Sequence, residues 1–190
     1  MSTRKLISFV GTSLDGYHED LDHGIGWMNL SDDFGEYSVT QLDELGGLVF
    51  GRRTYDGMVD YWTSAEAQAA SPEVAARMHA LPKTVVSRSP GVVEWTNTAT
   101  VTGDVAEAIG ALKRQPGKPL ALFGSSTLTT HLLTIGLVDE VRVMVSPVLL
   151  GAGASLFAGL DGGVPVDLLR VTTFRSGNVL LCYRPRPEAG

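Results

Sequence analysis

The chain has 190 residues, of which 44% are hydrophobic and 19% charged, so it is long and apolar enough to bury a core. Its formal charge is −6 and no basic run interrupts the acidic balance, so we expect no nucleic-acid partner. The apolar stretch near the start is short, and no run of about 18 apolar residues occurs, so the sequence predicts a cytoplasmic protein without a membrane segment.

Short apolar or β-branched runs predict buried strands, and amphipathic patterns between them predict helices. The predicted strands cover residues 6–10, 48–50, 84–86, 120–123 and 141–145. The predicted helices cover residues 33–45, 72–81, 105–113 and 127–135. This alternation favours an α/β fold in which helices cover both faces of a largely parallel sheet.

The C-terminal region departs from the alternation. Residues 166–175 and 179–184 resemble strands and are joined by Ser176-Gly177-Asn178, which predicts a β-hairpin that adds antiparallel strands at the sheet edge. No internal repeat or change of composition marks a domain boundary. We therefore expect a single domain over residues 1–190, with a loose tail from about residue 185.

Gly51-Arg52-Arg53-Thr54 follows the strand at 48–50 and opens the next helix. A glycine lets a ligand approach the backbone, arginine supplies a fork of donors, and threonine caps the helix or binds phosphate. The pattern is typical of an anion site, although a glycine turn followed by solvated arginines has the same sequence.

Two further strand ends carry anion-binding chemistry. Gly124-Ser125-Ser126-Thr127 follows the strand at 120–123 and precedes a helix, whose N-terminal N–H groups favour phosphate, although simple capping uses the same residues. Ser87 and Arg88 end the strand at 84–86. Ligands of open α/β sheets bind at the carboxyl ends of strands, so three such ends together favour a nucleotide.

The order of these motifs, after Ser13-Leu14-Asp15-Gly16-Tyr17 near the start, resembles the dihydrofolate reductase superfamily from Leu6 to Tyr183. Two later segments narrow the resemblance. Gly136-Leu137-Val138-Asp139-Glu140 and Ser146-Pro147-Val148-Leu149-Leu150-Gly151 are similar to the C-terminal reductase domain of the bifunctional deaminase-reductase of riboflavin biosynthesis.

The resemblance implies a dihydrofolate-reductase-like mixed, mostly parallel sheet with helices on both faces and a C-terminal antiparallel hairpin. It also implies NADPH lying across the strand ends, and a homodimer. Gly51, Arg52, Arg53 and Thr54 would bind the pyrophosphate and the adenosine 2′-phosphate. Ser87 and Arg88 would lie on the adenosine side, with Gly124, Ser125, Ser126 and Thr127 holding the pyrophosphate.

Three functions are consistent with these features. The first is NADPH-dependent reduction of a small heterocyclic substrate, of the 5-amino-6-(5-phosphoribosylamino)uracil reductase type. The others are dihydrofolate reductase activity and NADPH binding without turnover. Folate is disfavoured because the segment before Thr84 lacks the arginine that grips the folate glutamate. Ser125 replaces the second glycine of the family's phosphate loop, which disfavours the cis bond often found there.

Asp32 and Asp33 are the candidate catalytic residues. Trp27 precedes Asp32 by the spacing that folate reductases use for their pterin-binding carboxylate, whereas Asp33 with Glu36 also fits a helix cap. The acidic segment 15–23 has no calcium-loop spacing and no paired-histidine helix motif, so we predict no metal. We expect residues 13–27 to form a flexible cover over the cofactor.

Overall fold

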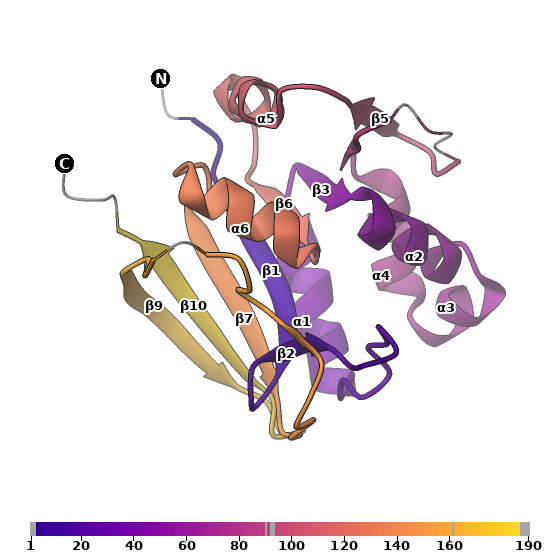
Figure 1. The fold of residues 1–190 in the computed structure, drawn as a ribbon. Helices are drawn as coiled ribbons and strands as arrows, with labels where there is room; N and C mark the ends of the chain where they lie inside the picture. Colours follow the sequence, from indigo (N-terminus) through magenta and orange to yellow (C-terminus); the bar gives the residue numbers. More distant parts are fainter. Residues whose placement is uncertain (1–2, 90, 92–93, 161, 187–190) are drawn as a thin grey trace.

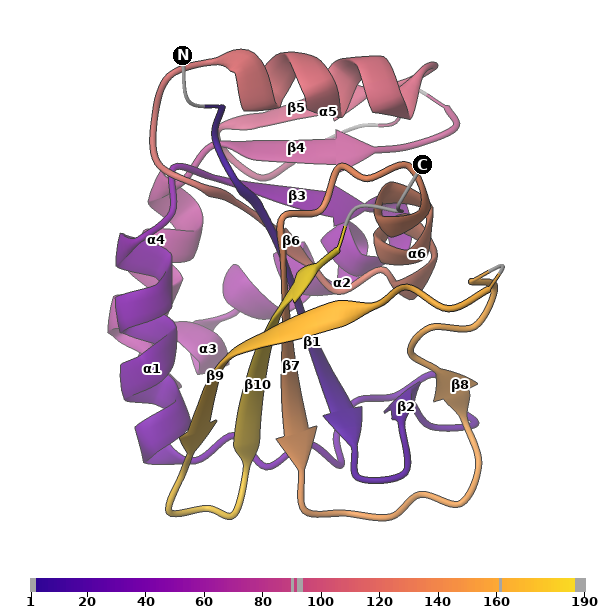
Figure 2. The same ribbon diagram turned by 90° about the vertical axis from the view of Figure 1, so that its left-hand side faces the viewer.

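The computed structural model describes residues 3–89, 91, 94–160 and 162–186. Its centre is an eight-stranded sheet with the order β5-β4-β3-β6-β1-β7-β10-β9, and β2 pairs separately with β8 (Figures 1 and 2). The strands are β1 (Leu6–Ser13), β2 (Tyr17–Glu19), β3 (Gly47–Gly51), β4 (Lys83–Val86), β5 (Thr98–Val101), β6 (Leu120–Phe123), β7 (Glu140–Ser146), β8 (Ala154–Ser155), β9 (Val166–Thr173) and β10 (Val179–Pro185). The helices are α1 (Asp32–Asp43), α2 (Arg52–Trp62), α3 (Ala65–Ala70), α4 (Pro72–Ala80), α5 (Val105–Arg114) and α6 (Ser126–Thr134).

The sheet is mixed in the way that the sequence predicts. Neighbouring strands from β5 to β7 pair in parallel, whereas β10 pairs antiparallel with β7 and with β9. Every predicted strand and helix is present, with ends displaced by at most three residues. The predicted mixed, mostly parallel sheet with a C-terminal antiparallel hairpin is therefore confirmed.

Four short elements have no counterpart in the sequence prediction: β2, β5, β8 and α3. Strand β5 reads Thr-Ala-Thr-Val, lies at the edge of the sheet and is partly exposed, so it lacks the apolar run that indicates the buried strands. The other three have two, three or six residues, too few to show a period. Each of them is fixed by tertiary contacts instead.

Helices cover both faces of the sheet, because alternate side chains of each strand point to opposite sides. Val49 and Leu122 face the core beneath α5 and α6, whereas Leu48, Phe50 and Ala121 face the core beneath α1, α2 and α4. Figure 2 shows α1 and α4 on one side of the sheet and α6 on the other. The buried strands place their carboxyl ends at one edge of this sandwich.

The segment Gly136-Leu137-Val138-Asp139-Glu140 has a structural role. The Asp139 carboxylate accepts hydrogen bonds from the Leu6 N–H at 2.7 Å and from Lys113 Nζ at 2.5 Å. Lys113 also donates to the Leu137 carbonyl at 2.7 Å. These contacts tie the start of β1 to the end of α5 and to the turn before β7, so they fix the strand that passes through the middle of the sheet.

Asp15 joins two motifs that are far apart in the sequence. Its carboxylate accepts hydrogen bonds from Ser13 Oγ at 2.7 Å, from the Gly151 N–H at 2.7 Å and from the Leu150 N–H at 3.1 Å. The Ser13 hydroxyl contributes most, and with the backbone N–H groups it lowers the pKa of Asp15 to about 2. The loop after β1 is thus tied to the loop after β7.

The last described residue, Arg186, is bound to the rest of the fold. The Arg186 N–H donates to the Pro165 carbonyl at 2.8 Å, and its guanidinium pairs with Asp167 at 2.7 Å. Pro185 still belongs to β10, so the predicted loose tail does not begin at residue 185. The rest of that predicted tail, residues 187–190, lies outside the described residues. No described helix has the length and apolar character that a membrane crossing requires.

Lys83 is buried at the start of β4, with an exposed fraction of 2%. Its ammonium donates hydrogen bonds to the carbonyls of His79, Leu81 and Thr96 at 2.8–3.1 Å, and lies 4.6 Å from the centre of the Trp95 ring. The lysine therefore joins the end of α4 to the segment that leads into β5.

We predict that Lys83→Met lowers the free energy of unfolding by about 2–4 kcal/mol, because the carbonyls lose their shared donor inside the fold. Denaturant unfolding measures the change. The matched control is Lys5→Met at an exposed lysine, for which we expect a change within about 0.5 kcal/mol. Equal stability of the two variants would contradict the role assigned to Lys83.

We predict that Asp15→Asn speeds hydrogen exchange at the Leu150 and Gly151 amides, because the neutral amide is a weaker acceptor than the carboxylate. The pKa of Asp15 is lowered to about 2 from an ordinary 3.8, so its contribution is present above about pH 4 and is lost as the pH falls through 2. Asp22→Asn, in the same loop region, is the control and leaves these amides unchanged. Unaltered exchange in Asp15→Asn would exclude the tie.

Candidate functional site

The candidate site lies where β3, β4 and β6 end. In the sheet β3 pairs with both β4 and β6, with Gly51 opposite Val86 and Val49 opposite Leu122. Because these pairings are parallel, the loops that follow the three strands leave the sheet at the same edge. The topology therefore brings together the three segments to which the sequence assigns anion binding.

Two of these loops touch through their glycines. A Cβ on Gly51 would lie 2.5 Å from Ser125 Oγ, and a Cβ on Gly124 would lie 2.8 Å from the Thr54 methyl group. Gly124 has φ +64° and Ser125 has φ +53°, both in the left-handed region, and the bond between them is trans. Only small residues fit where these two loops meet. We call the backbone of Gly51 and Gly124, with the side chains of Thr54 and Ser125, the cradle; it lies between the starts of α2 and α6.

Helix α6 begins directly behind this cradle. Ser125 is its N-cap residue, but the Ser125 side chain makes no capping hydrogen bond. Ser126 and Thr127 form the first turn, where N–H groups have no partner within the helix. The helix therefore starts at Ser126 and not at Thr127, and anion binding at this start stays a prediction.

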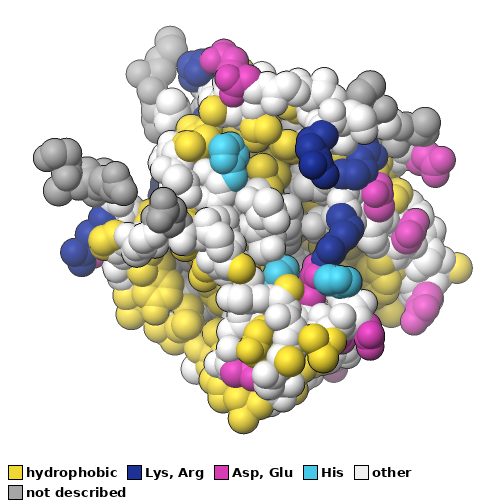
Figure 3. Space-filling model, viewed as in Figure 1, with side chains coloured by type: hydrophobic (Ala, Val, Ile, Leu, Met, Phe, Trp, Pro, Cys, Tyr) yellow, Lys and Arg dark blue, Asp and Glu magenta, His cyan; other side chains and the backbone are white. Residues whose placement is uncertain are grey.

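A cavity of about 550 Å³ adjoins the cradle, lined by Arg52, Ser87, Arg88 and Ser89 together with Val86, Gly103 and Val105. It brings together three of the predicted cofactor residues: Arg52, Ser87 and Arg88. Arg52 lies 5.6 Å from the centre of the Tyr55 ring and 3.6 Å from Asp56. In Figure 3, Lys and Arg side chains gather on the face between α5 and α2.

Sequence reasoning did not find the wall that α5 contributes. Gly103 and Val105 line the cavity, and Asp104 between them caps the helix by accepting a hydrogen bond from the Glu107 N–H at 3.0 Å. The sequence does show the capped helix start. What it does not show is β5, the short strand that delivers this helix start to the same edge of the sheet as the other loops.

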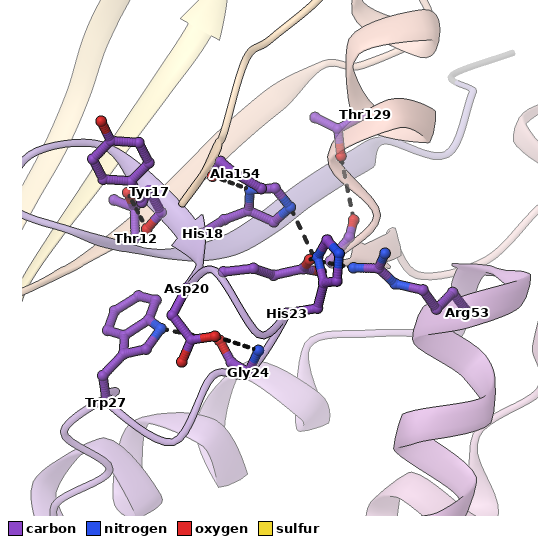
Figure 4. Close-up of polar contacts among 12 residues, drawn as sticks. Thr12, Tyr17, His18, Asp20, His23, Gly24, Trp27, Arg53, Thr129 and Ala154 are labelled. Atoms are coloured by element: carbon purple, nitrogen blue, oxygen red, sulfur yellow. Dashed lines mark hydrogen bonds and ion pairs between the residues drawn. The ribbon is translucent and has the colours of Figure 1, made fainter. Parts of the chain in front are cut away.

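Arg53 points away from the cavity that holds Arg52. Its guanidinium forms an ion pair with Glu19, the last residue of β2 (Figure 4). His23 Nδ1 lies 3.1 Å from the same carboxylate, and His18 Nε2 lies 3.7 Å from it. Burial alone would raise the pKa of Glu19, but the bonds with Arg53 and His23 outweigh it and hold the pKa below its ordinary value. The predicted pair Arg52 and Arg53 is thus divided between two places.

The segment expected to form a flexible cover, residues 13–27, is pinned at its base. Strand β2 pairs with β8, and His18 Nδ1 lies 2.8 Å from the Ala154 carbonyl. A carbonyl oxygen only accepts, so His18 carries its proton on Nδ1 and turns Nε2 toward Glu19. Gly153 has no Cβ where the Glu19 carbonyl lies, which lets the two backbones approach.

The two candidate carboxylates differ in their surroundings. Asp32 is exposed, at the start of α1. Asp33 is shielded to 14% exposure, and it accepts hydrogen bonds from Ser31 Oγ and from the Arg175 N–H. The hydrogen bond from Ser31 has the largest effect and lowers the pKa of Asp33. Asp33 is not the helix cap that the sequence favours, because Ser31 is the N-cap residue and Asp33 lies in the first turn.

Trp27 does not contact either carboxylate through its indole nitrogen. Its Nε1 donates to the Gly24 carbonyl at 3.1 Å, which closes a turn of the cover segment (Figure 4).

Within the described ranges, no three His, Cys, Asp or Glu side chains gather closely enough to hold a metal ion.

Solved structures of several reductases share this fold. A deaminase/5-amino-6-(5-phosphoribosylamino)uracil reductase from Thermotoga maritima aligns with a TM-score of 0.71 at 17% identity, over 97% of this chain and 57% of that one. Dihydrofolate reductase from Enterococcus faecalis, complexed with NADP(H), aligns with a TM-score of 0.64 at 13% identity, over 96% of this chain and 97% of that one. At these identities the likeness shows the fold alone.

The protein YyaP of Bacillus subtilis (strain 168) is 27% identical over 183 residues, which is 96% of each chain. Residues 4–180 match the RibD C-terminal domain family. The matched range includes the cradle, the cavity lined by Arg52 and Arg88, and the hydrogen bonds that Asp15 and Asp139 accept. The chain belongs to the RibD C-terminal domain family.

Proposed function

We propose that this chain is an NADPH-dependent reductase of a small heterocyclic substrate. The observation that carries the proposal is the cavity that holds Arg52, Ser87 and Arg88 beside the cradle formed by Gly51 and Gly124. Cations at one end and unpaired helix N–H groups at the other suit a ligand with two separate phosphate groups. NADPH has two such groups, the pyrophosphate and the 2′-phosphate. NADH lacks the 2′-phosphate and so does not need the cations that bind it.

In this proposal the cradle holds the pyrophosphate. Gly51 and Gly124 let the phosphates approach the backbone, and Thr54, Ser125, Ser126 and Thr127 supply hydroxyl and N–H donors. Arg52, Ser87 and Arg88 hold the adenosine 2′-phosphate. When bound, NADPH supplies the hydride, and the protein orients both reactants and excludes water. Because Gly51 and Gly124 lack a Cβ, Ser125 and Thr54 of the opposite loops approach them closely, and this brings the donors of both loops within reach of one pyrophosphate.

The substrate that we propose first is 5-amino-6-(5-phosphoribosylamino)uracil, on the basis of the family and of the activity in the name of the Thermotoga maritima neighbour. Asp33 is the better substrate anchor of the two candidate carboxylates, since it is shielded and its lowered pKa keeps it anionic. An anionic carboxylate binds N–H groups of a ring edge. Asp32 is exposed, which weakens the folate alternative that its spacing from Trp27 favours.

We also propose that the chain forms a homodimer through β9 and β10. Strand β9 is the edge of the sheet, and Val166, Leu168 and Val171 on it are 41%, 56% and 48% exposed. Figure 3 shows a broad apolar area over these strands. An exposed apolar patch beside an unpaired antiparallel edge suits a second copy of the same surface.

For the cofactor, we predict that Arg52→Ala and Arg88→Ala each weaken NADPH binding by roughly ten- to a hundredfold, because each removes a charge-assisted contact with the 2′-phosphate. NADH affinity changes by less than about twofold. Fluorescence titration of both cofactors measures this. Arg186→Ala, at the C-terminal end of the described chain, is the matched control.

Equal binding of NADPH and NADH by the parent, unchanged in either arginine variant, would contradict the phosphate assignment. Turnover is tested separately by loss of NADPH absorbance with the phosphoribosylamino-uracil and with dihydrofolate. Tight NADPH binding without hydride transfer to either, or to flavins, would favour a binding protein over an enzyme.

For the dimer, we predict that Leu168→Lys combined with Val171→Lys converts the protein to a monomer, because two charges would have to be buried in the interface. Light scattering after size exclusion measures the mass. Leu21→Lys, at a leucine that is 75% exposed in the cover segment, is the control and leaves the dimer intact. A parent that is already a monomer at micromolar concentration would refute the proposal.

A further inference from the structure

The ion pair between Glu19 and Arg53 lies beside the candidate cofactor cradle. Arg53 is the second residue of α2, two positions after Gly51, whose backbone touches Ser125. Figure 4 shows the Arg53 side chain reaching from α2 toward the cover segment. Arg53, which the sequence assigns to the cofactor phosphates together with Arg52, is therefore paired with a carboxylate of the same chain.

The Glu19 carboxylate is held firmly. Its side chain is 16% exposed, whereas that of Arg53 is 67% exposed. His23 Nδ1 lies 3.1 Å from one oxygen, and His18 Nε2 lies 3.7 Å from the other. Behind it, the Glu19 backbone rests on Gly153. The carboxylate is thus surrounded by three groups that can carry positive charge, and the segment that bears it is fixed at its base.

A carboxylate and a phosphate are competing partners for one arginine. Both accept paired hydrogen bonds from the planar guanidinium, and two anions cannot approach it together without mutual repulsion. Other anions in the same turn do not take this place. Asp20 uses Oδ1 to accept from the Asp22 and Gly24 N–H groups, which shapes the turn that follows Glu19.

We propose that Glu19 is an internal anion that stands in for a cofactor phosphate at Arg53, forming an acidic latch (Glu19 on Arg53) that the cofactor displaces. The proposal rests on the function proposed above. Binding then requires the Glu19 side chain to leave Arg53, and the turn from Asp20 to Gly24 loses a restraint. The latch lowers cofactor affinity and couples cofactor binding to the tip of the cover segment, since each ligand of Arg53 weakens the other.

Three variants separate contact from charge. Glu19→Gln removes the charge and keeps the shape, and Glu19→Asp keeps the charge but draws it back from Arg53. Asp22→Asn removes a charge from the same turn away from Arg53. We expect the two Glu19 variants to bind NADPH roughly three- to tenfold more tightly than the parent, and Asp22→Asn to change affinity by less than about twofold.

A second measurement needs no cofactor. Hydrogen exchange at the Asp20, His23 and Gly24 amides, which donate within the turn, is faster in both Glu19 variants than in the parent. NADPH added to the parent speeds the same amides. The Leu150 and Gly151 amides serve as the internal reference, because Asp15 holds them whether or not the latch is closed.

The possible outcomes are distinct. Equal or weaker NADPH binding in both Glu19 variants would overturn the latch. A general charge effect would instead raise the affinity equally in Glu19→Gln and Asp22→Asn and leave it unchanged in Glu19→Asp, and that result would also overturn the latch. Failure of the parent to bind NADPH would contradict the proposed function instead. In that event inorganic pyrophosphate is the probe, and the same order of affinities supports the latch while equal affinities refute it.

Discussion

The site depends on one steric constraint: two loop backbones meet where no Cβ fits. Gly51 follows β3 and Gly124 follows β6, and each lies against a side chain of the other loop, Ser125 or Thr54. Because β3 and β6 are neighbours, this contact sets the separation of the α2 and α6 starts. The distance between the two helix starts determines where their N–H and hydroxyl groups lie. The arrangement of donors at this edge of the sheet therefore depends on the missing Cβ atoms of Gly51 and Gly124.

Much of the fold follows from local patterns in the sequence. The central strands are continuous apolar runs because both of their faces are covered, and α5 begins at a capping aspartate that accepts from the Glu107 N–H. The short elements could not be predicted in this way. Strand β5 has four residues and an exposed edge, and β2 and β8 pair with each other although they are far apart in the sequence. Long-range contacts determine where these strands lie, and a local sequence pattern does not contain that information.

The candidate site shows the same division. The parallel order of β4, β3 and β6 brings Arg52, Ser87 and Arg88 to one cavity, as their strand-end positions indicate. Arg53 differs, because successive residues of a helix point about 100° apart and Glu19 is available on its side. Glu19 itself gives no signal in the sequence, since its partners lie on other segments. Charge pairing across loops was the part that spacing could not reveal.

The bonds from Asp15 to Leu150 and Gly151, together with the β2–β8 pair, make two distant loops into one structural unit. Gly153 adds to this, because its missing Cβ is the space that the Glu19 carbonyl fills. Loop grafting between relatives must respect that unit. A chimaera that exchanges the loop after β1 has to carry the segment after β7 with it, because Asp15 binds Gly151 although more than a hundred residues separate them.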